Sequence, residues 1–260
     1  MRIIRILNGD CKKSKHTPIV WMHLAIPLIG AIAMALYVSL SPSAYNVSNV
    51  LGYLQLVAIA FPMLIGVICS MSIEQESQAG NFQVLFISSN PKYLALLSKF
   101  LYLVIFGAGS VSLAVYCYVV GITVITHKSL FSWSFYLIAI LILIGSFVFD
   151  YMFHLFLSLC FGKGASIGVG IAELLISAIF NTDLGDNIWV AFPCTWGIRF
   201  VTTWTKYASK SALQSVENMM ADQTKVELNA GILICIIATV LCVVFTCIWF
   251  THWEGKKYED

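Results

Sequence analysis

Charged residues are scarce in this chain. Only 11% of the 260 residues are Asp, Glu, Lys or Arg, whereas 59% are hydrophobic. A soluble domain carries about a quarter charged residues, and a single globule of this size has no core large enough for so much apolar surface. The composition therefore predicts a polytopic membrane protein, and the net charge of +2 gives no support for nucleic-acid binding.

Signatures of catalysis and of metal binding are also missing. The sequence has no GxxxxGK[ST] phosphate loop, because the pair Gly162-Lys163 is followed by Gly164 and lacks the upstream glycine. It has no HExxH motif, and its eight cysteines include no CxxC and no Cys/His metal spacing. We therefore expect no enzyme, no metal site and no directly bound cofactor, so a partner would have to supply the energy for any energised work.

Six stretches are apolar enough to be membrane spans, which need about 20 residues each. They are residues 19–40, 50–71, 100–126, 134–160, 165–181 and 229–250. We expect an all-α membrane protein with six transmembrane helices in a single domain over residues 1–260.

Lysine and arginine indicate the orientation of these spans. If the N-terminus is cytoplasmic, ten of the 15 basic residues lie inside, and four of the five outside lie in one long loop. We therefore expect cytoplasmic termini, a cytoplasmic loop at 72–99 and an extracellular loop at 182–228. Residues 1–17 mix Arg2 and Arg5 with isoleucines, which fits a cytoplasmic interfacial helix or a basic tail that only sets the topology.

The polar loop after the second span carries the clearest resemblance to a known family. It contains Glu74, Glu76 and Gly80 and ends in Pro91 before the next span. This pattern resembles the permease subunits of ABC-2 type ABC transporters. Three segments, at 13–30, 74–92 and 153–199, are most similar to the lantibiotic-immunity permeases of that group.

The resemblance implies a fold, partners and a task. The fold would be the ABC-2, type V exporter-like permease with cytoplasmic termini, in the cell membrane of a Gram-positive bacterium. The partners would be an ATPase subunit, itself a homodimer that binds ATP and Mg, and a second homologous permease. The task would be self-immunity, in which a lantibiotic peptide is expelled from the producer's membrane. Rival interpretations are an ABC-2 exporter of another antibiotic or a lipid, an intramembrane enzyme and a proton-coupled transporter.

Within the polar loop we expect an ATPase-coupling element at residues 73–86. Its candidate residues are Glu74, Glu76, Gly80 and Phe82. The apolar residues would hold the element at the membrane surface, while the glutamates would face water or a partner. A solvated loop with two charges is the alternative.

Two further groups of residues are candidate sites. Asp150 and His154 lie one helical turn apart in the fourth span, and Glu173 lies at a similar depth in the fifth. They fit a clamp between the two spans, helped by close approach at Gly164, Gly168 and Gly170, or else a proton relay, a substrate-contacting patch or an enzyme site. In the long outer loop, aromatic residues recur every three or four positions, which predicts a peptide-contact platform or interfacial anchors, in two short helices because of Pro193. These residues include Trp189, Trp196, Phe200 and Trp204.

Overall fold

The computed structural model describes residues 2–15, 17–41, 45–80, 82–83, 91–186, 188–210 and 218–255. Over these residues the chain is helical and holds no strand, which confirms the all-α prediction. The α-helices are α1 (Arg2–Ser14), α2 (Pro18–Leu40), α3 (Val47–Gln78), α5 (Tyr93–Thr126), α6 (Trp133–Cys160), α7 (Lys163–Ile179), α8 (Trp196–Lys210) and α9 (Asn218–His252). Between α7 and α8 lie the 3-10 helices η2 (Asp183–Gly185), η3 (Trp189–Ala191) and η4 (Pro193–Thr195).

The helix ends coincide with local sequence signals. Pro18 occupies the first turn of α2, where its missing N–H costs nothing. The side chain of Asn46 caps α3 by accepting a hydrogen bond from the Asn49 amide at 3.0 Å. Helix α5 ends at His127, whose φ of 52° is the left-handed conformation common at helix C-termini.

Among the described residues, five helices are long and apolar enough to cross a membrane, namely α2, α3, α5, α6 and the Leu228–His252 part of α9. Each includes one of the predicted stretches. Helix α7 includes most of the stretch predicted at 165–181, but its 17 residues extend only about 25 Å at 1.5 Å per residue. That is shorter than a hydrocarbon core of about 30 Å, so a complete sixth span stays a prediction.

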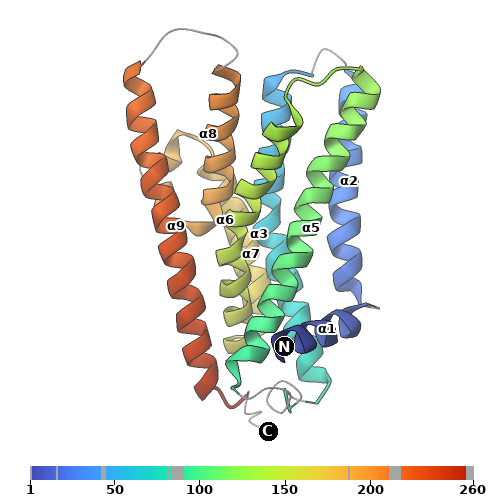
Figure 1. The fold of residues 1–260 in the computed structure, drawn as a ribbon, viewed down its shortest axis with the longest axis vertical. Helices are drawn as coiled ribbons and strands as arrows, with labels where there is room; N and C mark the ends of the chain where they lie inside the picture. The colour runs from blue at the N-terminus through green and yellow to red at the C-terminus, as the bar shows by residue number, and fades with distance from the viewer. Residues whose placement is uncertain are drawn as a thin grey trace.

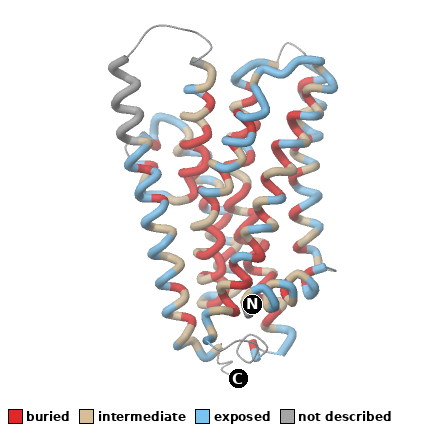
Figure 2. The backbone as a smooth tube through the Cα atoms, in the orientation of Figure 1, coloured by how far each residue is buried: buried red, intermediate tan, exposed pale blue. Residues whose placement is uncertain are grey.

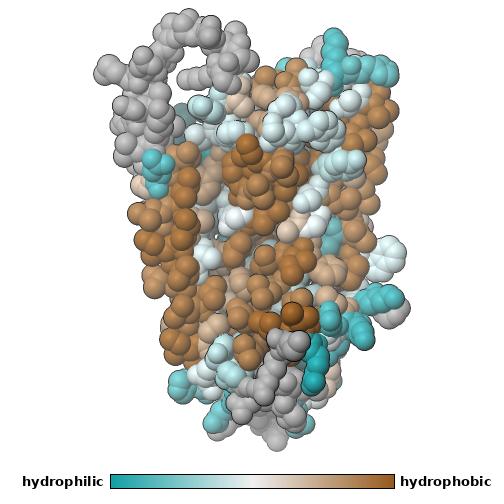
Figure 3. All heavy atoms as spheres, viewed as in Figure 1, coloured by the Kyte–Doolittle hydropathy of each residue, from teal (hydrophilic) through white to brown (hydrophobic). Residues whose placement is uncertain are grey.

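The long helices run roughly side by side, and α1 lies across one end of the bundle (Figure 1). We call this the α1 end. Both α1 and the last turn of α9 lie there, on the same side of the bundle. Apolar residues cover the middle of the molecule and hydrophilic residues gather at its ends (Figure 3), as a membrane-spanning bundle requires.

Helix α3 lies at the centre of the bundle and packs against α7, α6, α8 and, less extensively, α2 and α5. Two thirds (67%) of its most apolar stretch is buried inside the protein, compared with 22% for α2 and 17% for α9. Figure 2 shows the same contrast between buried inner helices and the exposed outer faces of α2 and α9. These two outer helices present their apolar side chains to the surroundings, including Trp21, Leu36, Leu233 and Leu241.

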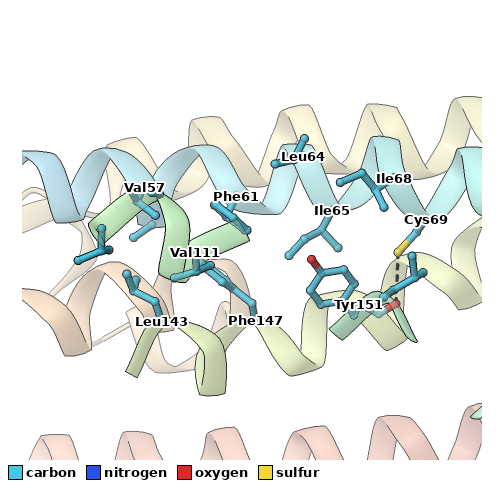
Figure 4. Close-up of a cluster of buried hydrophobic side chains, with 14 of the residues drawn as sticks. Val57, Phe61, Leu64, Ile65, Ile68, Cys69, Val111, Leu143, Phe147 and Tyr151 are labelled. Carbon is cyan, nitrogen blue, oxygen red and sulfur yellow. Dashed lines mark hydrogen bonds between the residues drawn. The ribbon is translucent and has the colours of Figure 1, made fainter. Parts of the chain in front are cut away.

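The contact between α3 and α6 forms the main core (Figure 4). Phe61 of α3 stacks on Phe147 of α6 with ring centroids 5.0 Å apart. Further toward the α1 end, the Cys69 thiol donates a hydrogen bond to the Tyr151 carbonyl oxygen at 3.6 Å. The Tyr151 ring fits beside Gly107 of α5, where an added Cβ would collide with its hydroxyl group. Close packing at this point therefore requires glycine at position 107.

We predict that Gly107→Ala destabilises the protein, whereas Gly109→Ala, two residues along the same helix, does not. A Cβ at position 109 meets nothing within 4 Å. A Cβ at position 107 forces Tyr151 or α5 to shift, and overpacking of this kind costs about 1–3 kcal/mol. Thermal unfolding of the two variants in detergent, followed by tryptophan fluorescence, measures the difference. Equal unfolding temperatures would show that α5 and α6 are not packed as described.

Candidate functional site

A buried ion cluster joins three helices at the α1 end. Glu76, in the last turns of α3, is only 2% exposed. Its Oε1 accepts hydrogen bonds from Lys99 Nζ of α5 at 2.9 Å and from Lys13 Nζ of α1 at 3.2 Å. Lys99 Nζ also lies 3.9 Å from Asp10 Oδ1 of α1. We call these four residues (Asp10, Lys13, Glu76 and Lys99) the α1-end ion cluster.

Further hydrogen bonds complete the cluster. The Ser98 hydroxyl donates to Asp10 Oδ2 at 3.0 Å, and Lys99 Nζ donates to the Ser72 hydroxyl at 3.4 Å. Burial raises the pKa of Asp10 above its usual value, and the nearby Lys99 ammonium opposes that rise. The four formal charges sum to zero, so the cluster holds α1 against α3 and α5 without leaving a buried charge uncompensated.

The prediction that Glu76 faces water or a partner is wrong. Glu76 lies near the end of α3 and Lys99 near the start of α5, and the 2.9 Å bond between them shows that they lie at similar depth. A carboxylate at that depth is stabilised by an ammonium group of the protein more than by the surrounding apolar atoms. The signal in the sequence was a single Lys directly before one apolar run and a Glu five residues after the end of the run before it.

The other predicted coupling residues lie close to this cluster. Glu74 Oε2 accepts from Lys163 Nζ, the first residue of α7, at 2.8 Å, and both side chains are partly exposed. Gly80 has a φ of 123°, which favours glycine. Phe82 is 3% exposed and its ring lies edge-on to Trp253, with centroids 5.0 Å apart. Of the predicted element at 73–86, residues 81 and 84–86 lie outside the described residues.

A second polar group lies inside the bundle, between α6 and α7. His154 Nε2 of α6 lies 2.8 Å from Glu173 Oε2 of α7, and His154 Nδ1 lies 3.0 Å from the Ser166 hydroxyl. That hydroxyl donates its proton to the carbonyl oxygen of Gly66 on α3, at 2.9 Å. The chain of bonds links three helices and agrees with the predicted clamp. We call His154, Ser166 and Glu173 the α6–α7 clamp.

The hydrogen bonds of the clamp determine which ring nitrogens of His154 carry a hydrogen. The single hydroxyl proton of Ser166 is used on Gly66, so Ser166 must accept from His154 and Nδ1 must carry a hydrogen. One further proton lies between Nε2 and Glu173, giving either a charged pair or two neutral groups. In both cases the net charge of His154 and Glu173 is zero.

Asp150 does not belong to the clamp. It is 1% exposed, and neither carboxyl oxygen has a hydrogen-bond partner among the described residues. The predicted close approach of α6 and α7 at Gly164, Gly168 and Gly170 is wrong, because only Gly170 lies in close contact with another helix, and that helix is α3. Added Cβ atoms at Gly164 and Gly168 would meet nothing within 4 Å, whereas one at Gly170 would meet the backbone of Met63 at 3.1 Å.

The predicted aromatic platform is largely inside the protein. Trp189 is 6% exposed, Trp196 1% and Phe200 8%. Trp196 lies edge-on to Phe149 of α6 and donates from Nε1 to the Val190 carbonyl oxygen at 2.9 Å. The three- and four-residue spacing marks a buried helical face equally well, so the prediction of an exposed face is wrong for these residues. The predicted break at Pro193 is confirmed, since η4 starts there and α8 follows it.

Trp204 is the exception among the four, since it is half-buried and stacks on the exposed ring of Tyr207. Its Nε1 donates to the Phe135 carbonyl oxygen at 3.2 Å. Trp204 and Tyr207 therefore remain accessible at the end of the bundle opposite α1.

Comparison with protein families gives one finding. A family model described as "ABC-2 family transporter protein" matches residues 6–179 of the 260. That range reaches from within α1 to the end of α7 and includes both the α1-end ion cluster and the α6–α7 clamp. Neither the curated proteins nor the solved structures contain a match.

We predict that Glu173→Gln is tolerated and that Glu173→Ala is not. With a hydrogen fixed on Nδ1, His154 Nε2 can accept from a glutamine amide, so the first variant keeps the bond. The alanine variant leaves a buried ring nitrogen unpartnered, which costs about 1–3 kcal/mol. Unfolding temperatures of the two purified variants measure the difference. Equal loss in both would mean that the charge of Glu173, and not its hydrogen bond, holds α7 in place.

A second prediction compares two ion pairs of similar length, 2.9 Å for Lys99 and Glu76 and 2.8 Å for Lys163 and Glu74. Lys99→Met leaves Glu76 and Asp10 buried without their main cation, and breaking a buried pair costs about 3–5 kcal/mol. Lys163→Met breaks a partly exposed pair, which is worth about 0–1 kcal/mol. Denaturation in detergent compares the two variants with the unchanged protein. Comparable stability of both variants would show that Glu76 is solvated and not part of a buried cluster.

Proposed function

Because the chain belongs to the ABC-2 family of transporter proteins, we propose that it removes a lantibiotic from the membrane of the cell that makes the peptide. The family gives the general part of this function, a multi-pass membrane permease of an ABC exporter that works with an ABC ATPase. The lantibiotic substrate, the second homologous permease and the Gram-positive host rest on the resemblance of residues 13–30, 74–92 and 153–199.

A separate ATPase is consistent with the chemistry of the chain. Nucleotide binding uses a glycine-rich loop with a lysine at the phosphates, and this sequence has no such loop. ATP and Mg therefore belong on the partner subunit. The permease then has to receive mechanical work at a surface that the partner can reach.

Residues 78–83 are the proposed docking surface for the ATPase. Gln78, Ala79, Gly80 and Gln83 are exposed at the α1 end, directly after the central helix α3. The observation that carries this proposal is that ion pairs attach this end of α3 to three other helices. Glu76 binds Lys99 of α5 and Lys13 of α1, and Glu74 binds Lys163 of α7.

This attachment supports a route for the motion. A displacement at residues 78–83 moves the end of α3, and the ion pairs carry α1, α5 and the start of α7 with it. Removing one partner of a buried pair costs more than removing one partner of an exposed pair, so the bond between Glu76 and Lys99 is the most costly of these links to break. Phe82 supports the same surface by packing against Trp253 after α9.

We predict that a long charged side chain on the docking surface weakens the binding of the ATPase and its coupling to the permease. Ala79→Arg and Gln83→Arg place a long cation on exposed positions, without disturbing a buried contact of this chain. Ser129→Arg, at the opposite end of the bundle, is the matched control. The measurements are the amount of ATPase that co-purifies and the stimulation of ATP hydrolysis by substrate. We expect each to fall at least several-fold for the first two variants only. Normal values for both variants would leave residues 78–83 as a solvated turn.

The substrate is tested separately, by resistance. We expect a strain sensitive to the lantibiotic to become resistant when it expresses this chain together with the neighbouring ATPase and permease genes. The chain alone should give no protection, because it has no means of using ATP. Resistance from this chain alone would contradict the proposal. Protection against an unrelated antibiotic, without protection against any lantibiotic, would favour the more general exporter.

A further inference from the structure

Asp150 is a buried carboxyl group that the proposed function does not use. It lies on α6, one helical turn before His154, and is 1% exposed. Both of its carboxyl oxygens are buried without a hydrogen-bond partner among the described residues. His154 cannot serve as that partner here, because its two ring nitrogens already bind Ser166 and Glu173.

Within the part of the chain that the structure describes, the helices around Asp150 bring no free cation to it. Lys99 of α5 binds Glu76, Lys163 of α7 binds Glu74, and Arg199 of α8 binds Asp186 and the carbonyl oxygens of Phe180 and Thr182. The ionisable groups that act electrostatically on or with Asp150 are a carboxyl group, a phenol and thiols. They are Glu173 of α7, Tyr151 of α6, Cys69 of α3, Cys194 of η4, and Cys235 and Cys242 of α9.

The net charge of Asp150, His154 and Glu173 indicates whether Asp150 carries a proton. His154 and Glu173 together carry no net charge, whichever of them holds the shared proton. An ionised Asp150 would therefore add one uncompensated negative charge in the apolar centre of the bundle. Burying such a charge without a partner is strongly unfavourable. The group of three is neutral only when Asp150 carries a proton of its own.

We propose that Asp150 is a proton-binding site, occupied in this conformation and emptied when the transport cycle opens the junction of α3, α6, α7 and α9. In contact with water, an aspartate side chain loses its proton at neutral pH. A conformation that admits water to Asp150 therefore releases the proton, and closure takes one up. Because binding and conformation are linked, an acidic medium favours the closed bundle. The release step rests on the proposed function, whereas occupancy in the resting state does not.

Infrared spectroscopy of the full-length chain reconstituted in lipid tests the occupied site. A protonated carboxyl group has a carbonyl stretch well separated from that of a carboxylate. We expect such a band at neutral pH, shifted by ¹³C labelling of aspartate and lost in Asp150→Asn. Asp10→Asn is the matched control, because Asp10 is the other buried aspartate and has Ser98 and Lys99 as partners. This variant should keep the band assigned to Asp150.

The isotope shift also tests the site in the unchanged protein, should Asp150→Asn fail to fold. Absence of a labelled aspartic acid band at neutral pH would overturn the proposal. The proposal would also be overturned if the band were lost in Asp10→Asn and kept in Asp150→Asn. These measurements use neither ATP nor substrate, so they succeed or fail independently of the transport function. The release step is tested on the complex with its ATPase trapped by an ATP analogue. The band should then fall, and an unchanged band in a trapped complex would refute proton exchange.

Discussion

The structure depends on how a mostly buried helix satisfies its polar groups. Helix α3 lies at the centre of the bundle, so the buried carboxylate of Glu76 cannot rely on water. Glu76 obtains its partners from Lys99 and Lys13, and the Gly66 carbonyl oxygen accepts a hydrogen bond from Ser166. These partners come from α5 and α1 at the α1 end and from α7 deeper in the bundle. A buried ion pair is often no more stabilising than apolar packing, but it allows only one register between α3, α5 and α1.

The same constraint gives a mechanical account of a permease driven by a separate ATPase. A motion applied where α3 leaves the bundle acts on a helix end that is tied to α1, α5 and α7. At greater depth, the bonds from Gly66 to Ser166, His154 and Glu173 tie α3 to the hairpin of α6 and α7. The outer helices α2 and α9 have mostly exposed apolar faces over their described side chains, although α2 packs closely on α5.

The sequence predicted the helices better than it predicted their partners. Hydropathy and the local signal at Pro193 are properties of neighbouring residues, and they located the helices to within several residues. The burial of Glu76 depends on Lys99, which is distant in sequence, and polarity alone suggested a surface residue. The pairing of His154 with Glu173 was predictable from their matched depth, but the isolation of Asp150 required the positions of all surrounding helices. For Trp189, Trp196 and Phe200, periodicity identified a helical face without showing whether lipid or protein covers it.

The claim that the end of α3 moves together with α1 can be measured as a distance. Spin labels at Ala79 and Lys12, carried by non-natural residues so that the eight native cysteines stay unchanged, report on the two exposed sides of the α1-end ion cluster. Electron spin resonance then gives the distribution of distances in the complex with the ATPase, without nucleotide and with an ATP analogue bound. The account predicts one narrow distribution that is the same in both states, in a preparation that hydrolyses ATP. A second distance, or clear broadening when nucleotide binds, would show that α1 and α3 separate and would contradict it.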